Sequence, residues 1–327
     1  MKALITGING QDGSYLAEHL LSLGYEVHGI LKRNSVAENQ TARLNHIFDK
    51  VTLDYADMTD MASLVRVLKQ FMPDEVYNLA AQSHVRISFD QPIYTAQVVA
   101  IGTLNLLEAI RLTCPDAKIY QASSSEMFGN SLDDDGFQRE TTPMHPASPY
   151  GCAKLFAYNL MRNYRHGYGM HTTNGILFNH ESPRRGTNFV TNKVVKAAVK
   201  IRYGLQDKLM LGNLDATRDW GHAKDYVRAM HMIINHTEPD DFVCATGISH
   251  SVKDLVKYTF TAVDLPWEQY VGVDEKYWRP DELVHLKGDP TKAKKVLNLE
   301  LEYTFETMID EMISYWLEYY RGKANVR

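Results

Sequence analysis

The chain begins Met1-Lys2-Ala3-Leu4-Ile5-Thr6-Gly7-Ile8-Asn9-Gly10-Gln11-Asp12-Gly13, and this stretch decides the fold. The first six residues are mostly apolar, as in a buried strand, and three glycines follow at once. Beyond them, apolar residues recur at helical spacing through Leu23. The pattern predicts a strand, a glycine loop and a helix. Free N–H groups and the helix dipole favour anions at such a helix N-terminus, so we expect a pyrophosphate to bind there.

The glycines of this loop are spaced G-x-x-G-x-x-G rather than the usual G-x-G-x-x-G of dinucleotide sites. A lone glycine pattern is often only a turn, but this one stands at the first strand-to-helix junction of an alternating chain. The candidate cofactor contacts in this loop are Gly7, Ile8, Asn9, Gly10, Gln11, Asp12 and Gly13.

Strand-like and helix-like segments alternate through the first half of the chain. The predicted strands are 25–31, 51–55, 75–80, 118–123 and 171–178, and the predicted helices are 61–71, 93–113 and 148–166. This alternation predicts an α/β fold, a Rossmann-type doubly wound parallel sheet. Ligands bind at the carboxyl ends of such strands, where the glycine loop, Asp57, residues 79–81 and residues 123–126 all fall.

The alternation loosens after about residue 178. We expect residues 1–178 to form the dinucleotide-binding domain, with later segments at roughly 213–245 returning to it. Residues 179–327 should form mainly a smaller C-terminal α/β cap that binds substrate.

Composition excludes several classes of function. The 327 residues are 44% hydrophobic and carry a net charge of −5, without the basic surface of a nucleic-acid-binding protein. We expect no apolar stretch long enough to span a membrane, no signal peptide, and a solvated loop at residues 133–135. Cys114, Cys152 and Cys244 lack metal-site spacing, so we expect no metal and mostly buried, reduced thiols in a cytoplasmic protein.

Tyr150 and Lys154 lie one turn apart if the segment after Pro149 is helical. An ammonium beside the phenol should lower its pKa from about 10, and the phenolate could then accept a proton from a sugar hydroxyl. Glu126, after three serines, offers a second base. Each feature has a plainer interpretation, namely a surface pair on an amphipathic helix and a carboxylate capping a turn. Their occurrence together with the glycine loop favours catalysis.

The end of the predicted second strand indicates which nicotinamide cofactor is used. Many NAD sites place an acidic residue there, whereas this chain continues Lys32-Arg33-Asn34. Arg33 would suit a 2′-phosphate, which favours NADP, although an ordinary cationic loop would look the same. Asp57 is placed to accept a hydrogen bond from an adenine amino group, or alternatively to cap the following helix.

These features, with N-L-A-A at 78–81, A-Q-S-H-V at 81–85, G-I-L-F-N-H-E-S-P-R-R-G at 175–186 and R-D-W-G-H-A-K-D-Y at 218–226, point to a family. Together they resemble the extended short-chain dehydrogenase/reductases that act on nucleotide sugars, and within that group the GDP-mannose 4,6-dehydratases. The resemblance covers nearly the whole chain.

The resemblance implies a redox-neutral hydro-lyase that converts GDP-mannose to GDP-4-keto-6-deoxy-mannose. Tyr150 would take the 4-hydroxyl proton while hydride passes from C4 to NADP. Glu126 would remove the C5 proton and help the 6-hydroxyl leave as water, and the hydride would return to C6. Ser124 stands where relatives often have Thr. Ser125 replaces the Asp of dehydratases acting on dTDP-glucose, which argues against that substrate.

The resemblance also implies further contacts. Candidates for the cofactor are Asn34, Ala56, Leu79, Ala80, Ala81, Ser83, Tyr94, Tyr150, Lys154, His180 and Arg185, and for the substrate Ser83, Ser124, Asn179, Lys193, Arg218, Arg279 and Glu282. Each cation among them could instead be a surface charge or part of a salt bridge.

The family further implies a homotetramer, built from dimers that pack through the helices at 93–113 and 148–166. Residues 32–43 would reach toward a neighbouring subunit. Deep burial within one subunit would produce the same apolar helices. The sequence therefore does not decide between a dimer and a tetramer.

Two other functions remain open at this stage. One is a 4-epimerase or 4-ketoreductase of the same fold, which needs no base for C5. The other is an NADP-binding sensor without turnover. The sequence also leaves open whether the product feeds D-rhamnose or L-fucose synthesis and whether the same enzyme reduces it.

Overall fold

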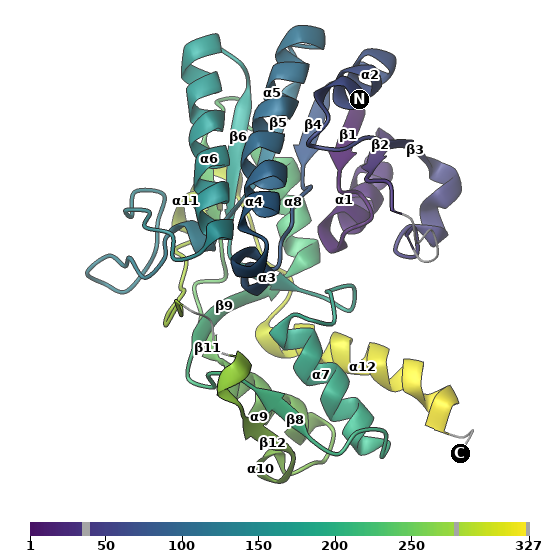
Figure 1. The fold of residues 1–327 in the computed structure, drawn as a ribbon, viewed down its shortest axis with the longest axis vertical. Helices are drawn as coiled ribbons and strands as arrows, with labels where there is room; N and C mark the ends of the chain where they lie inside the picture. Colours follow the sequence, from purple (N-terminus) through teal and green to yellow (C-terminus); the bar gives the residue numbers. More distant parts are fainter. Residues whose placement is uncertain (35–39, 278–280, 325–327) are drawn as a thin grey trace.

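The computed structural model describes residues 1–34, 40–277 and 281–324, which form a larger sheet lobe and a smaller lobe (Figure 1). Within these residues, the larger lobe holds a seven-stranded parallel sheet of order β10-β6-β5-β4-β1-β2-β3. The strands are β1 (Lys2–Thr6), β2 (Glu26–Leu31), β3 (Val51–Tyr55), β4 (Glu75–Asn78), β5 (Lys118–Ser124), β6 (Thr172–Leu177) and β10 (Asp241–Cys244). The predicted doubly wound parallel sheet is therefore confirmed.

Helices cover both faces of this sheet. On one face, α1 (Gln11–Ser22) packs against α8 (Ala223–Ile234). On the other lie α2 (Met61–Phe71), α5 (Gly102–Thr113) and α6 (Pro149–Tyr168). Because α8 and β10 complete this lobe, the chain returns to it after building part of the smaller lobe.

Local signals explain where several elements begin. The Asp60 carboxylate accepts hydrogen bonds from the N–H groups of Ala62 and Ser63 and so caps α2. The cap is thus Asp60, while the Asp57 carboxylate accepts from Thr59 in the preceding turn. Ser148 caps α6, with Pro149 at its first position.

The predicted helix at 93–113 is continuous but not uniform. It comprises α4 (Pro92–Ala96), a π-helical segment (Gln97–Ile101) and α5. Contrary to our expectation from the sequence, this segment of 22 residues is long and apolar enough to cross a membrane by length and composition. Of its most apolar window, 56% is buried inside the fold, as is common for a core helix.

One smaller expectation also needs correction. The acidic run at 133–135 is not simply solvated, because Asp133 and Asp135 both pair with Arg139, which also binds Asp289. The expectation of mostly buried thiols is confirmed, because Cys114 and Cys244 are buried and only Cys152, on α6, is exposed.

The smaller lobe is built mainly from helices. They are α7 (Val190–Arg202), α9 (Val252–Ala262), α10 (Trp267–Tyr270) and α12 (Phe305–Ala324), and α7 packs along α12. A sheet of β11 (Ser249–Ser251), β9 (Thr217–His222) and β7 (Asn179–Glu181) joins the lobes, and β12 (Val271–Val273) pairs with β8 (Leu209–Leu211). Short helices α3 (Val85–Asp90) and α11 (Thr291–Leu297) lie in the connections.

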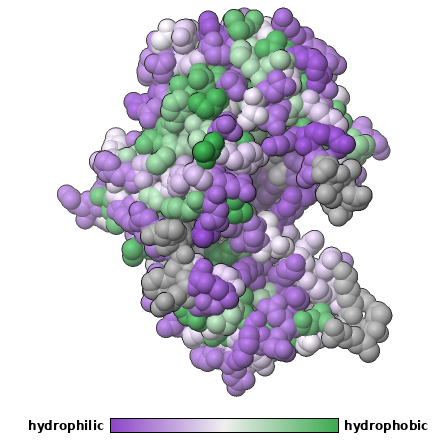
Figure 2. All heavy atoms as spheres, in the orientation of Figure 1, coloured by the Kyte–Doolittle hydropathy of each residue, from purple (hydrophilic) through white to green (hydrophobic). Residues whose placement is uncertain are grey.

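The two lobes leave a hollow between them (Figure 2). The carboxyl ends of the central strands open into this hollow, as expected for ligand sites in such sheets.

Candidate active site

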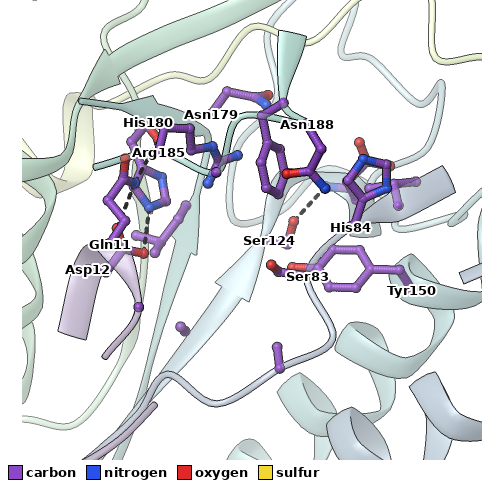
Figure 3. A pocket seen from close by; sticks show the side chains of 18 of the residues that line it. Gln11, Asp12, Ser83, His84, Ser124, Tyr150, Asn179, His180, Arg185 and Asn188 are labelled. Atoms are coloured by element: carbon purple, nitrogen blue, oxygen red, sulfur yellow. Dashed lines mark hydrogen bonds and ion pairs between the residues drawn. The ribbon is translucent and has the colours of Figure 1, made fainter. Parts of the chain in front are cut away.

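A cleft of about 700 Å³ lies between the lobes. Its wall includes the ends of β1, β4 and β5, the start of α6 and the cap segment that follows β6. Gln11, Asp12 and His180 lie on one side of the close view, and Ser83, Ser124 and Tyr150 on the other (Figure 3). The cleft therefore gathers the residues that the sequence singled out from distant parts of the chain.

The glycine loop forms a cradle at the start of α1. Gly7 adopts a φ of +69°, which favours glycine, and Gly10 caps α1 without any side-chain hydrogen bond to its first N–H groups. A Cβ at Gly13 would lie 2.4 Å from the Gly7 carbonyl oxygen, so this glycine allows strand and helix to pack closely. The tight turn and the helix N-terminus fit the diphosphate of a dinucleotide.

Next to the cradle, Asp12 and His180 form an ion pair. His180 Nε2 lies 2.8 Å from Asp12 Oδ2, and Nδ1 lies 2.8 Å from the Phe178 carbonyl oxygen. Gln11 Nε2 donates to Asp12 Oδ1 and to the His180 carbonyl oxygen, while its own Oε1 accepts from the Ser182 hydroxyl. These bonds join α1 of the sheet lobe to β7.

The far end of the cleft, beyond β2, carries positive charge. Lys32 Nζ lies 2.8 Å from the Tyr94 hydroxyl and 3.4 Å from an Asp57 oxygen, and all three residues line the cleft. Arg43 also lines it and donates to the carbonyl oxygens of Asn9 and Arg184. Arg33 and Asn34, which we predicted as contacts, are exposed outside the lining, as the Arg33 side chain lies over Tyr55.

Ser124, Glu126, Tyr150 and Lys154 come together on the sheet side of the cleft. The side chain of Ser124, at the end of β5, lies beside the Tyr150 hydroxyl and favours its ionised form, and its Oγ accepts the Glu126 N–H. Glu126 follows in a short 3₁₀ turn (Ser125–Met127) and is 8% exposed. Lys154 Nζ lies 5.7 Å from the centre of the Tyr150 ring, one turn along α6.

The electrostatics of Tyr150 differ from our expectation. Burial, followed by the nearby Glu126 charge, raises the pKa of Tyr150 well above its ordinary value, although Ser124 opposes this. Lys154 does not offset the rise, because its Nζ donates to the Ala122 carbonyl oxygen at 2.6 Å rather than to the phenol. Burial also lowers the pKa of Lys154 to about 8. The predicted depression of the phenol pKa by Lys154 is therefore wrong for this arrangement.

The cap side of the cleft carries cations that are held by protein partners. Arg185 pairs with the buried Glu181 and lies over Phe189, while Arg218 pairs with Glu282. Lys193 donates to the Met210 carbonyl oxygen and sits over the ring of Tyr277, 4.0 Å from its centre. All of these residues except Met210 line the cleft, as does Asn179. Arg279, also predicted, lies outside the described residues.

Most of the remaining predicted contacts also line the cleft, namely Gly7, Asn9, Gly10, Gly13, Ala56, Leu79, Ala80, Ala81 and Ser83. Ile8 does not, because it is fully buried in the core. The sequence reasoning assigned no role to His84, Arg184, Asn188 or Phe189, which line the wall as well. His84 and Arg184 stood inside the quoted motifs, whereas no signal pointed to Asn188 or Phe189.

Comparisons with known proteins agree with this geometry. The chain is 51% identical to GDP-mannose 4,6 dehydratase 2 of Arabidopsis thaliana, over 97% of this chain and 87% of the relative. It is 47% identical to GDP-mannose 4,6 dehydratase of Homo sapiens, over 99% and 93%.

Solved structures share the fold. RMD from Pseudomonas aeruginosa, complexed with NADPH, superposes with a TM-score of 0.80 at 21% identity, covering 97% of this chain and 99% of that one. dTDP-glucose 4,6-dehydratase from Bacillus anthracis, in complex with NAD, gives 0.84 at 22% identity, covering 98% of both chains. The family model for GDP-mannose 4,6 dehydratase matches residues 4–312, and the chain belongs to this family.

Proposed function

We propose that the protein is a hydro-lyase that converts GDP-mannose to GDP-4-keto-6-deoxy-mannose. The observation that carries this proposal is the meeting of Ser124, Glu126, Tyr150 and Lys154 beside a dinucleotide cradle in one cleft. Membership of the family supports the choice of substrate.

A bound nicotinamide would supply one piece of chemistry, accepting hydride from C4 of the mannose and returning it at C6. Tyr150 takes the proton of the 4-hydroxyl, and the Ser124 hydroxyl holds the same oxygen, as its place beside Tyr150 favours. The resulting 4-ketone acidifies the C5 proton, which Glu126 removes. Glu126 then gives this proton to the departing 6-hydroxyl, which leaves as water. C5 finally takes up one proton, which balances the proton that Tyr150 accepted from the 4-hydroxyl.

Ser125 supports the double role of Glu126. It stands next to Glu126, is 2% exposed and carries no carboxyl group. Because a serine hydroxyl is a poor proton donor for a leaving hydroxyl, the one carboxyl group of this pair serves both ends of the elimination.

A nicotinamide dinucleotide is the cofactor that the fold and the cradle support, and we propose NADP in particular. Two observations favour it. No acidic residue follows β2, and Lys32 and Arg43 line the cleft at that end. Arginine geometry suits a phosphate group. The cofactor should leave each cycle unchanged.

We further propose that residues 1–178, with α8 and β10 returning, bind the dinucleotide, and that residues 179–327 mainly bind substrate. Asn179, Lys193, Arg218 and Arg279 would hold the sugar diphosphate and Glu282 the guanosine. Arg218 and Lys193 are already held by hydrogen bonds and an ion pair within the protein. Their charges are therefore fixed in orientation at this wall, which favours binding of a diphosphate.

We also propose a tetramer of paired dimers. Ile93, Ile101 and Leu112 on the 92–113 helix and Phe156 on α6 are 73%, 46%, 61% and 42% exposed. Hydrophobic surface is also visible over the side of the sheet lobe where α5 and α6 run (Figure 2). Exposed apolar side chains on packed helices favour association. We place the protein in the cytoplasm, which its free thiols support.

The first experiment incubates purified protein with GDP-mannose and no added cofactor and follows the nucleotide sugar by mass spectrometry. Loss of one water without net NADPH formation supports the dehydratase. An unchanged mass, even with added NADP and NAD, would rule it out and favour an epimerase or reductase acting on another nucleotide sugar.

A further inference from the structure

The ring of His180 lies between two oxygen atoms that accept hydrogen bonds. Nδ1 is 2.8 Å from the Phe178 carbonyl oxygen, which has no proton to donate. Nε2 is 2.8 Å from Asp12 Oδ2. If Asp12 is ionised, both ring nitrogens must carry a hydrogen, and the ring is then an imidazolium.

The surroundings of Asp12 favour its ionised form. The Gln11 Oε1 atom accepts from the Ser182 hydroxyl, so the amide nitrogen of Gln11 must face Asp12 Oδ1 and donate to it. The Oδ1 atom of the carboxylate therefore meets a donor that does not depend on the His180 proton. Burial alone would raise the pKa of Asp12, but the neighbouring His180 charge and hydrogen bonds hold it below its usual value. Burial lowers the pKa of His180, but the neighbouring Asp12 outweighs burial, so the pKa of the ring is raised above its usual value.

The position of Asp12 gives this pair a consequence for binding. Asp12 stands in the first turn of α1, whose N-terminus fits a diphosphate. An uncompensated carboxylate there would repel that anion, because both compete for the same positive helix end. A cationic His180 at 2.8 Å offsets the carboxylate.

Other charged or titratable groups surround the pair from several elements. Arg185, after β7, lowers the pKa of both partners, and Glu181 on β7 is close enough for its own pKa to feel His180. Tyr226 on α8 stacks on the His180 ring, with ring centres 4.7 Å apart. Lys154 on α6 feels the charge of Asp12. Because Asp12 is the charged group hydrogen-bonded to the ring, it sets the His180 charge.

We propose that His180 is a positioning residue whose imidazolium neutralises Asp12 and so makes the glycine loop accept the diphosphate of the nicotinamide dinucleotide. This inference rests on the proposed function only in taking the cleft to bind such a dinucleotide. Asp12 and His180 also tie α1 to β7, so the same pair holds the cofactor cradle against the strand that carries Asn179.

The charge argument is tested by a double-mutant cycle on binding of free NADPH, followed by its fluorescence without any sugar substrate. His180→Gln leaves Asp12 uncompensated and should weaken binding about tenfold. Asp12→Asn, which removes the carboxylate itself, should lose less affinity than His180→Gln. The double variant, in which both charges are gone, should recover most of the lost affinity. Thermal unfolding of each variant reports whether it is folded.

The pH dependence provides a second readout. His180 loses its charge as pH rises through its raised pKa, so wild-type affinity should fall in that range. The double variant should show a level profile there. A double variant as weak as His180→Gln, or a His180→Gln protein that binds like wild type, overturns the proposal. Failure of wild type to bind any nicotinamide dinucleotide would instead remove the proposed function and this inference together.

A measurement without nucleotide separates these cases. Nitrogen-15 NMR of labelled histidine distinguishes an imidazolium from the neutral tautomers. We expect both His180 nitrogens to be protonated near pH 7 in wild type and the ring to titrate at lower pH in Asp12→Asn. A neutral His180 at that pH, which would mean that Asp12 carries the proton, contradicts the proposal.

Discussion

Replacing Gly13 by alanine tests whether close packing of strand and helix shapes the cofactor cradle. The added Cβ would lie 2.4 Å from the Gly7 carbonyl oxygen and 2.6 Å from the Ile8 Cα, both backbone atoms. No side chain can move aside, so the turn between β1 and α1 must open. Helix propensity alone would favour alanine by about 1 kcal/mol. Overpacking of this severity costs about 3 kcal/mol, so we expect a net loss of about 2 kcal/mol in the free energy of unfolding.

Gly167 provides a matched control for the same chemical change. It lies in the last turn of α6, is exposed, and has no atom within 4 Å of an added Cβ. Gly167→Ala should therefore stabilise the protein by about 0.5–1 kcal/mol.

Denaturant unfolding and NADPH binding would be measured for both variants. We expect Gly13→Ala to lose stability and at least about tenfold in affinity, because its N–H groups shift away from the phosphate position. Gly167→Ala should bind like wild type. If Gly13→Ala matches Gly167→Ala in both assays, close packing at Gly13 does not shape the cradle.

Three further predictions follow from the site and the surface. Glu126→Gln should slow water loss about 10²–10⁴-fold, because the base for the C5 proton is gone. Oxidation at C4 should still occur and would be seen as reduced nicotinamide without dehydrated product. Dehydration at the wild-type rate would contradict the role of Glu126. Lys154→Met should abolish turnover. Its free energy of unfolding at neutral pH should nevertheless be about 1–3 kcal/mol higher than that of wild type, since the substitution removes a buried charge. Because the pKa of Lys154 falls from 10.5 to about 8 on folding, the free energy of unfolding of wild type should rise relative to that of this variant between about pH 8 and about pH 10.5. A difference in denaturant unfolding that stays constant over this range would refute the prediction. Ile93→Arg should reduce the assembly mass in sedimentation, and an unchanged mass would exclude that surface as an interface.

The sheet lobe followed from the sequence because its signals are local. The predicted bounds of β3 and α2 agree with the structure. The alternating run of β3 ends before a turn in which the Thr59 N–H binds Asp57, and Asp60 then caps α2. The glycine loop could be predicted equally well, because its spacing and the strand and helix on either side can be recognised from a short local stretch of sequence. Strand ends shifted by one or two residues, as in β4, where hydrogen bonds rather than hydropathy decide the bounds.

The cap side of the cleft was harder because its contacts join distant segments without periodic patterns. Asn188 and Phe189 precede α7 in an irregular segment, so no spacing marks them as part of the wall. Arg139 gathers carboxylates from its own loop and from Asp289, which a local view of the acidic run could not show. The pKa of Tyr150 likewise depends on burial and on the Ala122 carbonyl oxygen that holds Lys154.

That last difference changes how the base is formed. A phenol with a raised pKa is neutral near pH 7, and Lys154 is itself close to losing its proton. The chain alone therefore does not keep Tyr150 as a phenolate. For Tyr150 to act as the proposed base, its ionisation must be favoured by charges that enter the cleft on binding. In the proposed reaction, such coupling would join removal of the 4-hydroxyl proton to hydride transfer, because neither would be favourable without the other.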